Sequence, residues 1–156
     1  MIGQEIYNFA QKLWPINRSI TGEGVRETLD LIKAHLPKLK INSVPSGSAV
    51  FDWTIPREWN VIEAYIISPS GEKICDFKVN NLHLVGYSIP FSGEIELSQL
   101  KEYLYTLPEQ SDAIPYITSY YRERWGFCIS HEQYSQLEDG IYTVKIDTQL
   151  FDGVLN

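Results

Sequence analysis

Tyr142-Thr143-Val144-Lys145-Ile146-Asp147 is the stretch of this 156-residue sequence that most directly decides its fold. Apolar and polar side chains alternate through it, which is the pattern of a β-strand with one buried and one solvated face. An Asp139-Gly140 turn precedes the stretch, and an Asp152-Gly153 turn follows it. Val154-Leu155 would then open a further strand that has no room to continue, so we expect the chain to stop within an element.

Further β-rich runs lie upstream of this strand. Residues 61–67 and 74–79 flank a Ser-Pro-Ser-Gly-Glu loop and predict a hairpin, with Cys75, Phe77 and Val79 on one face of its second strand. Residues 82–85, 94–97 and 125–129 predict three more strands, with turn material at 90–93. Ser98 predicts the cap of a short helix that reaches Leu107. Ser130 and Gln133 have the spacing of a capping box for a turn of helix over 131–137.

Two amphipathic helices are predicted at the start of the chain. Their apolar residues are spaced 4, 3 and 4 apart: Ile2, Ile6, Phe9 and Leu13 in the first helix, and Val25, Leu29, Ile32 and Leu36 in the second. Prolines end both helices, because proline excludes the helical conformation at the residue before it. Thr21 is predicted to cap the second helix, and Gly22 and Gly24 allow the backbone to approach a neighbour closely. A short strand is predicted at 39–41.

The fold class predicted is therefore α+β, with helices first and a β-rich part after them. The Pro45-Ser46-Gly47-Ser48 break and the Asp139-Gly140 turn divide the chain into three segments, residues 1–48, 49–138 and 139–156. At 44% hydrophobic and 21% charged residues the composition is globular.

The charge of the chain indicates which classes of partner it disfavours. The net charge is −7, and residues 46–115 hold ten acidic and four basic side chains. An acidic middle disfavours nucleic acid and anionic membranes as partners. The sequence begins without a basic, apolar leader and holds no apolar run near the length that spans a bilayer, so we expect a cytoplasmic protein. The two cysteines, Cys75 and Cys128, each lie in an apolar run and are expected to be small buried residues without a disulfide.

Motifs of known chemistry are few. The histidines at 35, 83 and 131 belong to no zinc-ligand spacing, so no metal site is expected from this chain. No Gly-x-Ser-x-Gly elbow and no phosphate-binding loop occur, so no catalytic residue is predicted.

Three constellations are candidates for binding. The link between the helices carries Arg18 and Glu23, which would either contact a substrate or cap and pack the second helix. His83 alternates with leucines and would be either a ligand contact or a hydrogen-bonded structural residue. The aromatic segment Ser119–Cys128 carries Tyr120, Arg124 and Trp125, residue types that are enriched where surfaces bind. Contact with a ligand or with another part of a larger protein, and simple core packing, both stay open for this segment.

Four ordered segments resemble one known family: residues 15–26 (PINRSITGEGVR), 51–59 (FDWTIPREW), 81–88 (NLHLVGYS) and 119–128 (SYYRERWGFC). Together they are similar to the zinc aminopeptidase-like proteins of bacteria and archaea that are associated with polysaccharide biosynthesis. The resemblance covers essentially the whole chain. It implies an α/β zinc-exopeptidase domain, begun by residues 1–48, that is interrupted by an inserted β-rich domain and resumed by the final strand.

The resemblance also implies where the chemistry lies. The family's metal ligands would follow the point at which this sequence stops, and nothing that matches them is present. Zinc is thus expected for the complete protein but not for this chain, which would be inactive alone. Its partner would be the remainder of the aminopeptidase-like domain, with a peptide or other small substrate near Arg18, Glu23, His83, Tyr120, Arg124 and Trp125. The alternative is a standalone, non-catalytic module that binds a peptide, a glycan or a protein.

Overall fold

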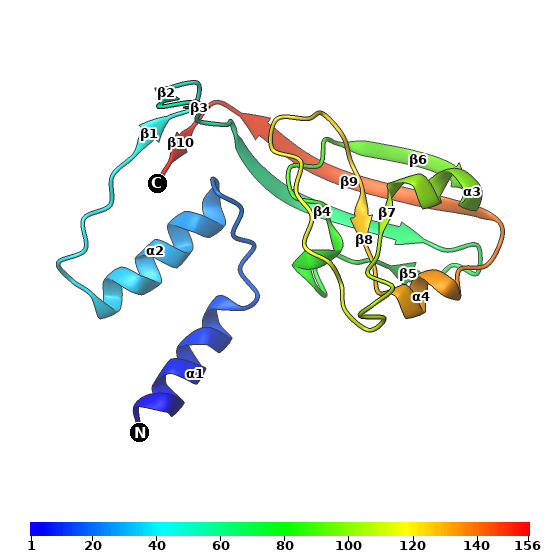
Figure 1. Cartoon of the computed structure of the whole chain (residues 1–156), viewed down its shortest axis with the longest axis horizontal. Helices are drawn as coiled ribbons and strands as arrows, with labels where there is room; N and C mark the ends of the chain where they lie inside the picture. The colour runs from blue at the N-terminus through cyan, green and yellow to red at the C-terminus, as the bar shows by residue number, and fades with distance from the viewer. The chain divides into compact units, whose positions relative to one another are not determined.

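A computed structural model describes all 156 residues of the chain (Figure 1). The helices are α1 (Ile2–Leu13), α2 (Glu23–His35), α3 (Leu97–Leu100) and α4 (His131–Ser135), with 3-10 turns η1 (Asn81–His83) and η2 (Lys101–Tyr103). The strands are β1 (Val44–Pro45), β2 (Ala49–Val50), β3 (Trp53–Thr54), β4 (Glu58–Ile67), β5 (Lys73–Ile74), β6 (Phe91–Glu96), β7 (Leu104–Tyr105), β8 (Phe127–Cys128), β9 (Ile141–Phe151) and β10 (Val154–Leu155). The mixed α+β class predicted from the sequence is confirmed.

The chain forms two compact units. Unit 1 comprises residues 1–60 and 150–156, and unit 2 comprises residues 61–149. These limits lie beyond the divisions at 48/49 and 138/139 that we predicted from turn residues. The reason is that β4 and β9 are long strands: the start of β4 and the end of β9 belong to unit 1, and the rest of each strand belongs to unit 2. Turn chemistry marks where a strand begins, and it does not show how far a strand runs before its partners change.

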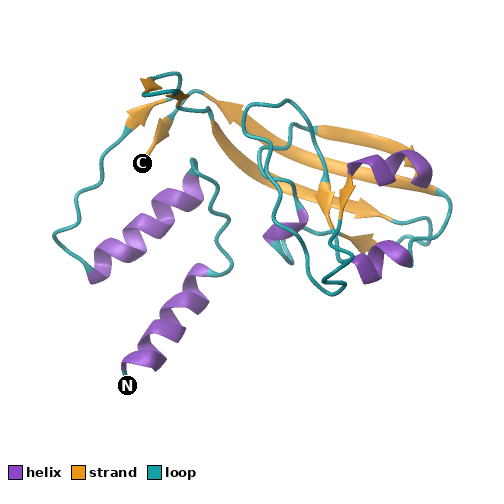
Figure 2. Ribbon diagram, in the orientation of Figure 1, coloured by secondary structure: helices purple, strands orange, loops and turns teal.

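Unit 2 is built on a four-stranded sheet in the order β5-β4-β9-β6 (Figure 2). β6 and β9 are antiparallel, in a register that pairs Phe91 with Ile146 and Glu96 with Ile141. Tyr142, Val144 and Ile146 are each 1% exposed, so the alternation in the deciding stretch does separate a core face from a solvated face. A second, parallel pair joins β7 to β8, whose Phe127 and Cys128 are completely buried.

Unit 1 holds the two N-terminal helices, and neither helix has a buried residue. Ile2 is 76% exposed, Ile6 64% and Leu36 58%, although all three lie on the apolar faces predicted from their spacing. The prediction of two helices is confirmed, and their apolar faces are only partly covered within this chain. Elsewhere in unit 1, β1 pairs antiparallel with β10, and β2 with β3.

The link between the helices shows why it contains two glycines. Gly22 has a φ of 101°, in the left-handed region that favours glycine, and a Cβ there would lie 2.8 Å from the carbonyl oxygen of Trp59. A Cβ on Gly24 would collide with the carbonyl oxygen of Asn17. The close backbone approach that the sequence predicted is therefore confirmed, and the neighbours approached are the start of the link itself and the beginning of β4.

Two predictions for unit 1 are wrong. Gly22, and not Thr21, is the N-cap of α2, and the hydroxyl of the buried Thr21 donates instead to the carbonyl oxygen of Arg57, at 3.3 Å. Residues 39–41 form no strand. The strand lies at Val44–Pro45 because β10 pairs with those residues, a long-range contact that local alternation does not reveal.

Several predicted boundaries in unit 2 are also wrong. β5 ends at Ile74 because Cys75 has a φ of 51°, which turns the chain and leaves Val79 81% exposed. Residues 81–83 form η1 and not a strand, because the side chain of Asn80 caps that turn by accepting from the Leu82 amide at 3.0 Å. Phe91 begins β6 and is not part of a turn.

Of the two predictions for the short helices of unit 2, one is wrong and one is confirmed. The N-cap of α3 is Glu96 and not Ser98, and the predicted helix stops early because Leu104 enters β7. The capping box at α4 is confirmed, since the hydroxyl of Ser130 accepts from the amide of Gln133 at 3.2 Å.

Candidate functional site

The start of the aromatic segment packs against a tyrosine from outside it, and the backbone of both tyrosines is strained. Tyr87 and Tyr120 both have positive φ angles, 65° and 37°, which are unusual for residues with bulky side chains. Their rings meet edge to face with centroids 5.2 Å apart, and the buried Tyr87 holds the partly exposed Tyr120 in place. The neighbouring Tyr121 is 58% exposed and Tyr116 is 64% exposed. Strain of this kind is often found at binding sites, so this end of the segment remains a candidate contact surface.

Trp125 lies in the core. It is 8% exposed, and its ring stacks on Tyr103 with centroids 4.0 Å apart and on Phe91 with centroids 4.3 Å apart. Both faces of the indole are thus covered by side chains from η2 and β6. Of the two readings open for this residue, the geometry favours packing over contact with a ligand.

Arg124 stabilises the loop of residues 118–124 with hydrogen bonds from its side chain. Its guanidinium donates to the carbonyl oxygen of Thr118 at 3.1 Å and to the hydroxyl of Tyr105 at 3.4 Å. The Nε–H of Arg124 is buried without a hydrogen-bond partner, and no carboxylate forms an ion pair with this side chain. The contacts therefore close the loop from residue 118 to residue 124 and hold Tyr120 and Tyr121 at its tip.

The three histidines are held in separate places. His83 is 8% exposed, and its Nδ1 lies 2.8 Å from the carbonyl oxygen of Cys128, which favours the interpretation as a hydrogen-bonded structural residue. His131 Nδ1 lies 2.9 Å from the hydroxyl of Thr106, and His35 packs edge-on against Phe9. No three His, Cys, Asp or Glu side chains come together in a way that could hold a metal ion.

Neither cysteine has the properties of a catalytic nucleophile. Cys75 and Cys128 are buried and unpaired. Burial raises the pKa of the Cys75 thiol to about 12, with a smaller contribution from Cys128, and burial likewise raises the pKa of Cys128 to about 12. Both thiols stay protonated near neutral pH, which excludes them as nucleophiles.

The link between the helices positions an ion-pair cluster that sequence reasoning missed. Arg26, on α2, reaches the Glu58 carboxylate at the start of β4 with two hydrogen bonds, of 2.9 and 2.7 Å. The side chain of Glu58 is 4% exposed, and its Oε1 also accepts from the Val154 amide of β10 at 2.8 Å. The exposed Glu23 adds an ion pair to Arg26 of 2.6 Å. Arg18, by contrast, is exposed and donates to the carbonyl oxygen of Leu13.

This cluster has a clear structural effect. A forked Arg26–Glu58 pair whose carboxylate also accepts a strand amide joins α2, β4 and β10, and Glu23 adds to it only from the exposed side, so substrate contact by Glu23 stays a prediction. Arg26 and Glu58 both lie in the segments that carry the family resemblance. An acidic residue next to a buried tryptophan in a strand, and an arginine in a helix that follows two glycines, are the signals from which the pair could have been found.

The cluster predicts how stability depends on pH. The hydrogen bond from Arg26 lowers the pKa of Glu58 below its ordinary value of 4.5, in spite of burial, and the Val154 amide lowers it further. A carboxyl whose folded-state pKa is depressed stabilises the fold above its unfolded-state pKa, and this stability is lost as the pH falls through the folded-state pKa. We therefore expect α2 and β10 to lose protection from hydrogen exchange below about pH 4.5. Glu58→Gln should flatten that dependence, and Glu27→Gln, on the exposed side of α2, should not.

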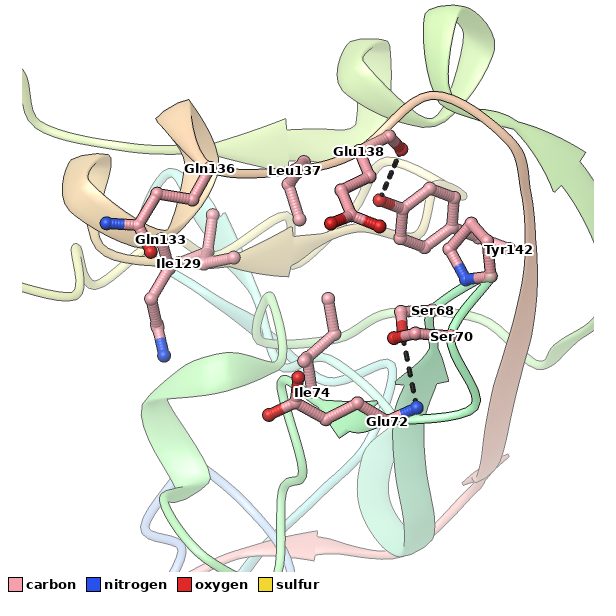
Figure 3. Close-up of a pocket in the computed structure, with 11 residues that line it drawn as sticks. Ser68, Ser70, Glu72, Ile74, Ile129, Gln133, Gln136, Leu137, Glu138 and Tyr142 are labelled. Atoms are coloured by element: carbon pink, nitrogen blue, oxygen red, sulfur yellow. Dashed lines mark hydrogen bonds between the residues drawn. The ribbon is translucent and has the colours of Figure 1, made fainter.

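Unit 2 also contains a hollow that the sequence did not reveal (Figure 3). Its volume is about 220 Å³, and it lies between the β4–β5 loop, α4 and the start of β9. Ile74, Ile129, Leu137 and Tyr142 provide the apolar walls, and Glu72, Gln133, Gln136 and Glu138 provide polar groups. No arginine, lysine or histidine lines it.

Four of the six predicted substrate-binding residues belong to unit 2 and two, Arg18 and Glu23, to unit 1. Within unit 2 the structure brings Tyr120 and Arg124 together in one loop. His83 and Trp125 are buried, and none of the four lines the hollow. No helix has the length and apolarity needed to cross a membrane.

Comparison with known proteins agrees with the resemblance seen in the sequence. Residues 58–149 match the family described as "Domain of unknown function (DUF2172)". A protein of Clostridium acetobutylicum named "Putative polysaccharide biosynthesis protein with aminopeptidase-like domain" is 52% identical over 153 residues, which are 98% of this chain and 35% of the relative. The crystal structure of a "putative peptidase" from the same organism superimposes with a TM-score of 0.93 at 51% identity, covering 99% of this chain and 36% of that one.

The chain thus spans about a third of the length of the relatives that it matches. The matched family region, residues 58–149, nearly coincides with unit 2, residues 61–149. The chain therefore belongs to the family described as a domain of unknown function, DUF2172.

Proposed function

We propose that this chain is the N-terminal portion of a longer aminopeptidase-like protein of polysaccharide biosynthesis, and that it is inactive on its own. The observation that carries this proposal is the 52% identity along 98% of the chain to a relative of which it covers only 35%. Zinc and exopeptidase chemistry would belong to the remaining part, because the residues present here do not form a metal site.

The incompletely covered helices support the same proposal. An amphipathic helix in a globular protein normally buries its apolar face, and neither α1 nor α2 contains a fully buried residue. Exposed on or beside them are Ile2, Ile6, Tyr7, Trp14 and Leu36. Such a patch typically marks an interface, and we propose that the remainder of the aminopeptidase-like domain covers it.

For substrate contact, we propose a smaller set of residues than the sequence predicted. Tyr120 and its exposed neighbour Tyr121 present ring surface, and Arg124 holds the loop that carries them. We propose that a peptide or other small substrate of the complete protein contacts this loop. His83 and Trp125 would support the loop from the core. We also propose a cytoplasmic location, which two unpaired cysteines favour because disulfides form mainly in oxidising compartments.

A standalone module that binds a peptide, a glycan or a protein is the alternative. It requires that the chain be stable and monomeric as it is. We expect the reverse, self-association of the isolated chain through α1 and α2, because exposed apolar patches drive association. Sedimentation velocity across a range of protein concentrations measures this directly.

Matched variants locate the interface. Ile2→Glu combined with Ile6→Glu should shift the isolated chain towards monomer. Val79→Glu, which places one glutamate at an exposed apolar position of unit 2, should leave self-association unchanged. A wild-type chain that stays monomeric at every concentration would favour the standalone module.

A further inference from the structure

The hollow in unit 2 has the concave shape and the mixed lining of a site for one small, polar molecule. Ligand sites combine apolar walls with polar groups that orient the ligand, and here six of the eleven lining residues are polar. Here the walls include Ile129 and Tyr142, each 1% exposed, so part of the hollow rests on the fixed core of the unit. Its volume of about 220 Å³ is below the range of drug-sized pockets. It exceeds the roughly 150 Å³ that accommodates a benzene ring, so a compact ligand fits.

The polar groups of the hollow fall into two classes. Ser68 and Ser70 are hydrogen-bonded to each other at 2.8 Å, and Gln133 accepts from Ser130 at 3.3 Å. The side chains of Glu72, Gln136 and Glu138 make no hydrogen bond or ion pair within the chain. Figure 3 shows the Glu138 carboxylate turned inward between Leu137 and the Tyr142 ring. These free acceptors are therefore available to a ligand.

The negative charge of the hollow favours a cationic ligand. Two carboxylates line it without any basic side chain, and the neighbouring Lys73 is occupied elsewhere by Asp76, at 3.2 Å, and by the ring of Tyr65, at 4.1 Å. The pKa of Tyr142 is raised by burial, and the carboxylates of Glu138 and Asp139 raise it further against the opposing hydrogen bond to the backbone of Glu138. Burial is the largest cause of this shift, and the negative charge at this wall comes from the carboxylates themselves, which repel anions and attract cations.

We propose that this hollow binds a small molecule that carries a primary ammonium group on a compact, partly apolar body. The ammonium group would donate to the Glu138 carboxylate, and the body would lie against Leu137 and Tyr142, with Glu72 adding negative charge on the other side of the hollow. The amino end of a short peptide and an amino sugar share this chemistry. The site lies within unit 2 and makes no use of the tyrosine loop or of the part that would hold zinc, so it stands independently of the function proposed above.

Titrations of the full 156-residue chain, followed by the backbone and side-chain amide resonances of Gln133, Gln136 and Leu137, test the site. The probes are leucinamide and glucosamine, each with its neutral N-acetyl counterpart. We expect millimolar binding of at least one amine, with shifts that centre on these residues, and no binding of the neutral forms. Tighter binding of leucinamide would identify a peptide amino end, and tighter binding of glucosamine an amino sugar.

Charge-removing variants complete the test. Glu138→Gln should weaken amine binding by about fivefold, because it removes the carboxylate that faces the ammonium group, and Glu72→Gln should weaken it less, because it removes only the second negative charge of the hollow. Glu94→Gln, at an exposed position of β6 outside the hollow, should have no effect. Equal binding of amines and neutral forms, equal loss in all three variants, or no shift at the lining residues with any probe would each overturn the proposal.

Discussion

Replacing Arg26 by alanine should lower the free energy of unfolding of unit 1 by about 3 kcal/mol, the loss typical when one partner of a buried ion pair is removed. The Glu58 carboxylate, 4% exposed, would then keep only the Val154 amide as a partner. Arg26 itself is 31% exposed, so we expect a value at the lower end of the range for fully buried pairs. Hydrogen exchange at the amides of α2 and β10 measures the effect within unit 1.

Two controls separate the ion pair from the loss of a long side chain. Arg57→Ala removes an exposed arginine beside Glu58 and should change the free energy of unfolding by less than about 0.5 kcal/mol. Arg26→Met combined with Glu58→Gln should recover much of the stability, because it removes both charges and keeps an acceptor for the Val154 amide. If the double variant were as unstable as Arg26→Ala, the uncompensated charge would not be the cause.

Trp125→Ala should destabilise unit 2 by about 4 kcal/mol, since it empties the space between two stacked rings. The ring is 8% exposed and lies between Phe91 and Tyr103, so its loss leaves a cavity in the core. Trp125→Phe should cost less because it keeps one aromatic layer. Urea unfolding together with hydrogen exchange at β6 and β8 measures both variants.

The matched control for this prediction is Tyr121→Ala. Tyr121 lies in the same loop and is 58% exposed, so its removal should change the free energy of unfolding by less than about 1 kcal/mol. If Trp125→Ala were as mild as Tyr121→Ala, the tryptophan would not be a core residue. Its role as a ligand contact would then be the better interpretation.

The elements predicted well from the sequence are those whose signal is local and long. The alternation at Tyr142, Val144 and Ile146 predicted β9, and the 4, 3, 4 spacing predicted α1 and α2. Ser130 capped α4 as predicted, because the capping box uses only contacts within one turn. In each case the residues that decide the structure lie within the element itself.

The elements predicted poorly depend on contacts that are distant in sequence. Phe91 belongs to a strand because it pairs with Ile146, although turn residues surround it. The run that follows Ile74 has strand-like residues, yet the positive φ of Cys75 ends the strand. β1 exists because β10 pairs with it across more than a hundred residues. Local propensity is a weak guide where tertiary pairing decides.

The candidate site shows the same limit. Residue types drew attention to the aromatic segment, and the structure divides it into an exposed tyrosine end and a core tryptophan, which composition alone cannot separate. The Arg26–Glu58 pair and the hollow beside α4 depend on residues far apart in the chain and became visible only in three dimensions.

The most direct test of the proposed function is the intact mass and zinc content of the native protein, purified from its source. We predict a chain of about three times 18.0 kDa, since the matched relative is that much longer, with zinc bound in a stoichiometric amount. A native product of 18.0 kDa without stoichiometric metal would contradict the proposal that this chain is part of a larger aminopeptidase-like protein.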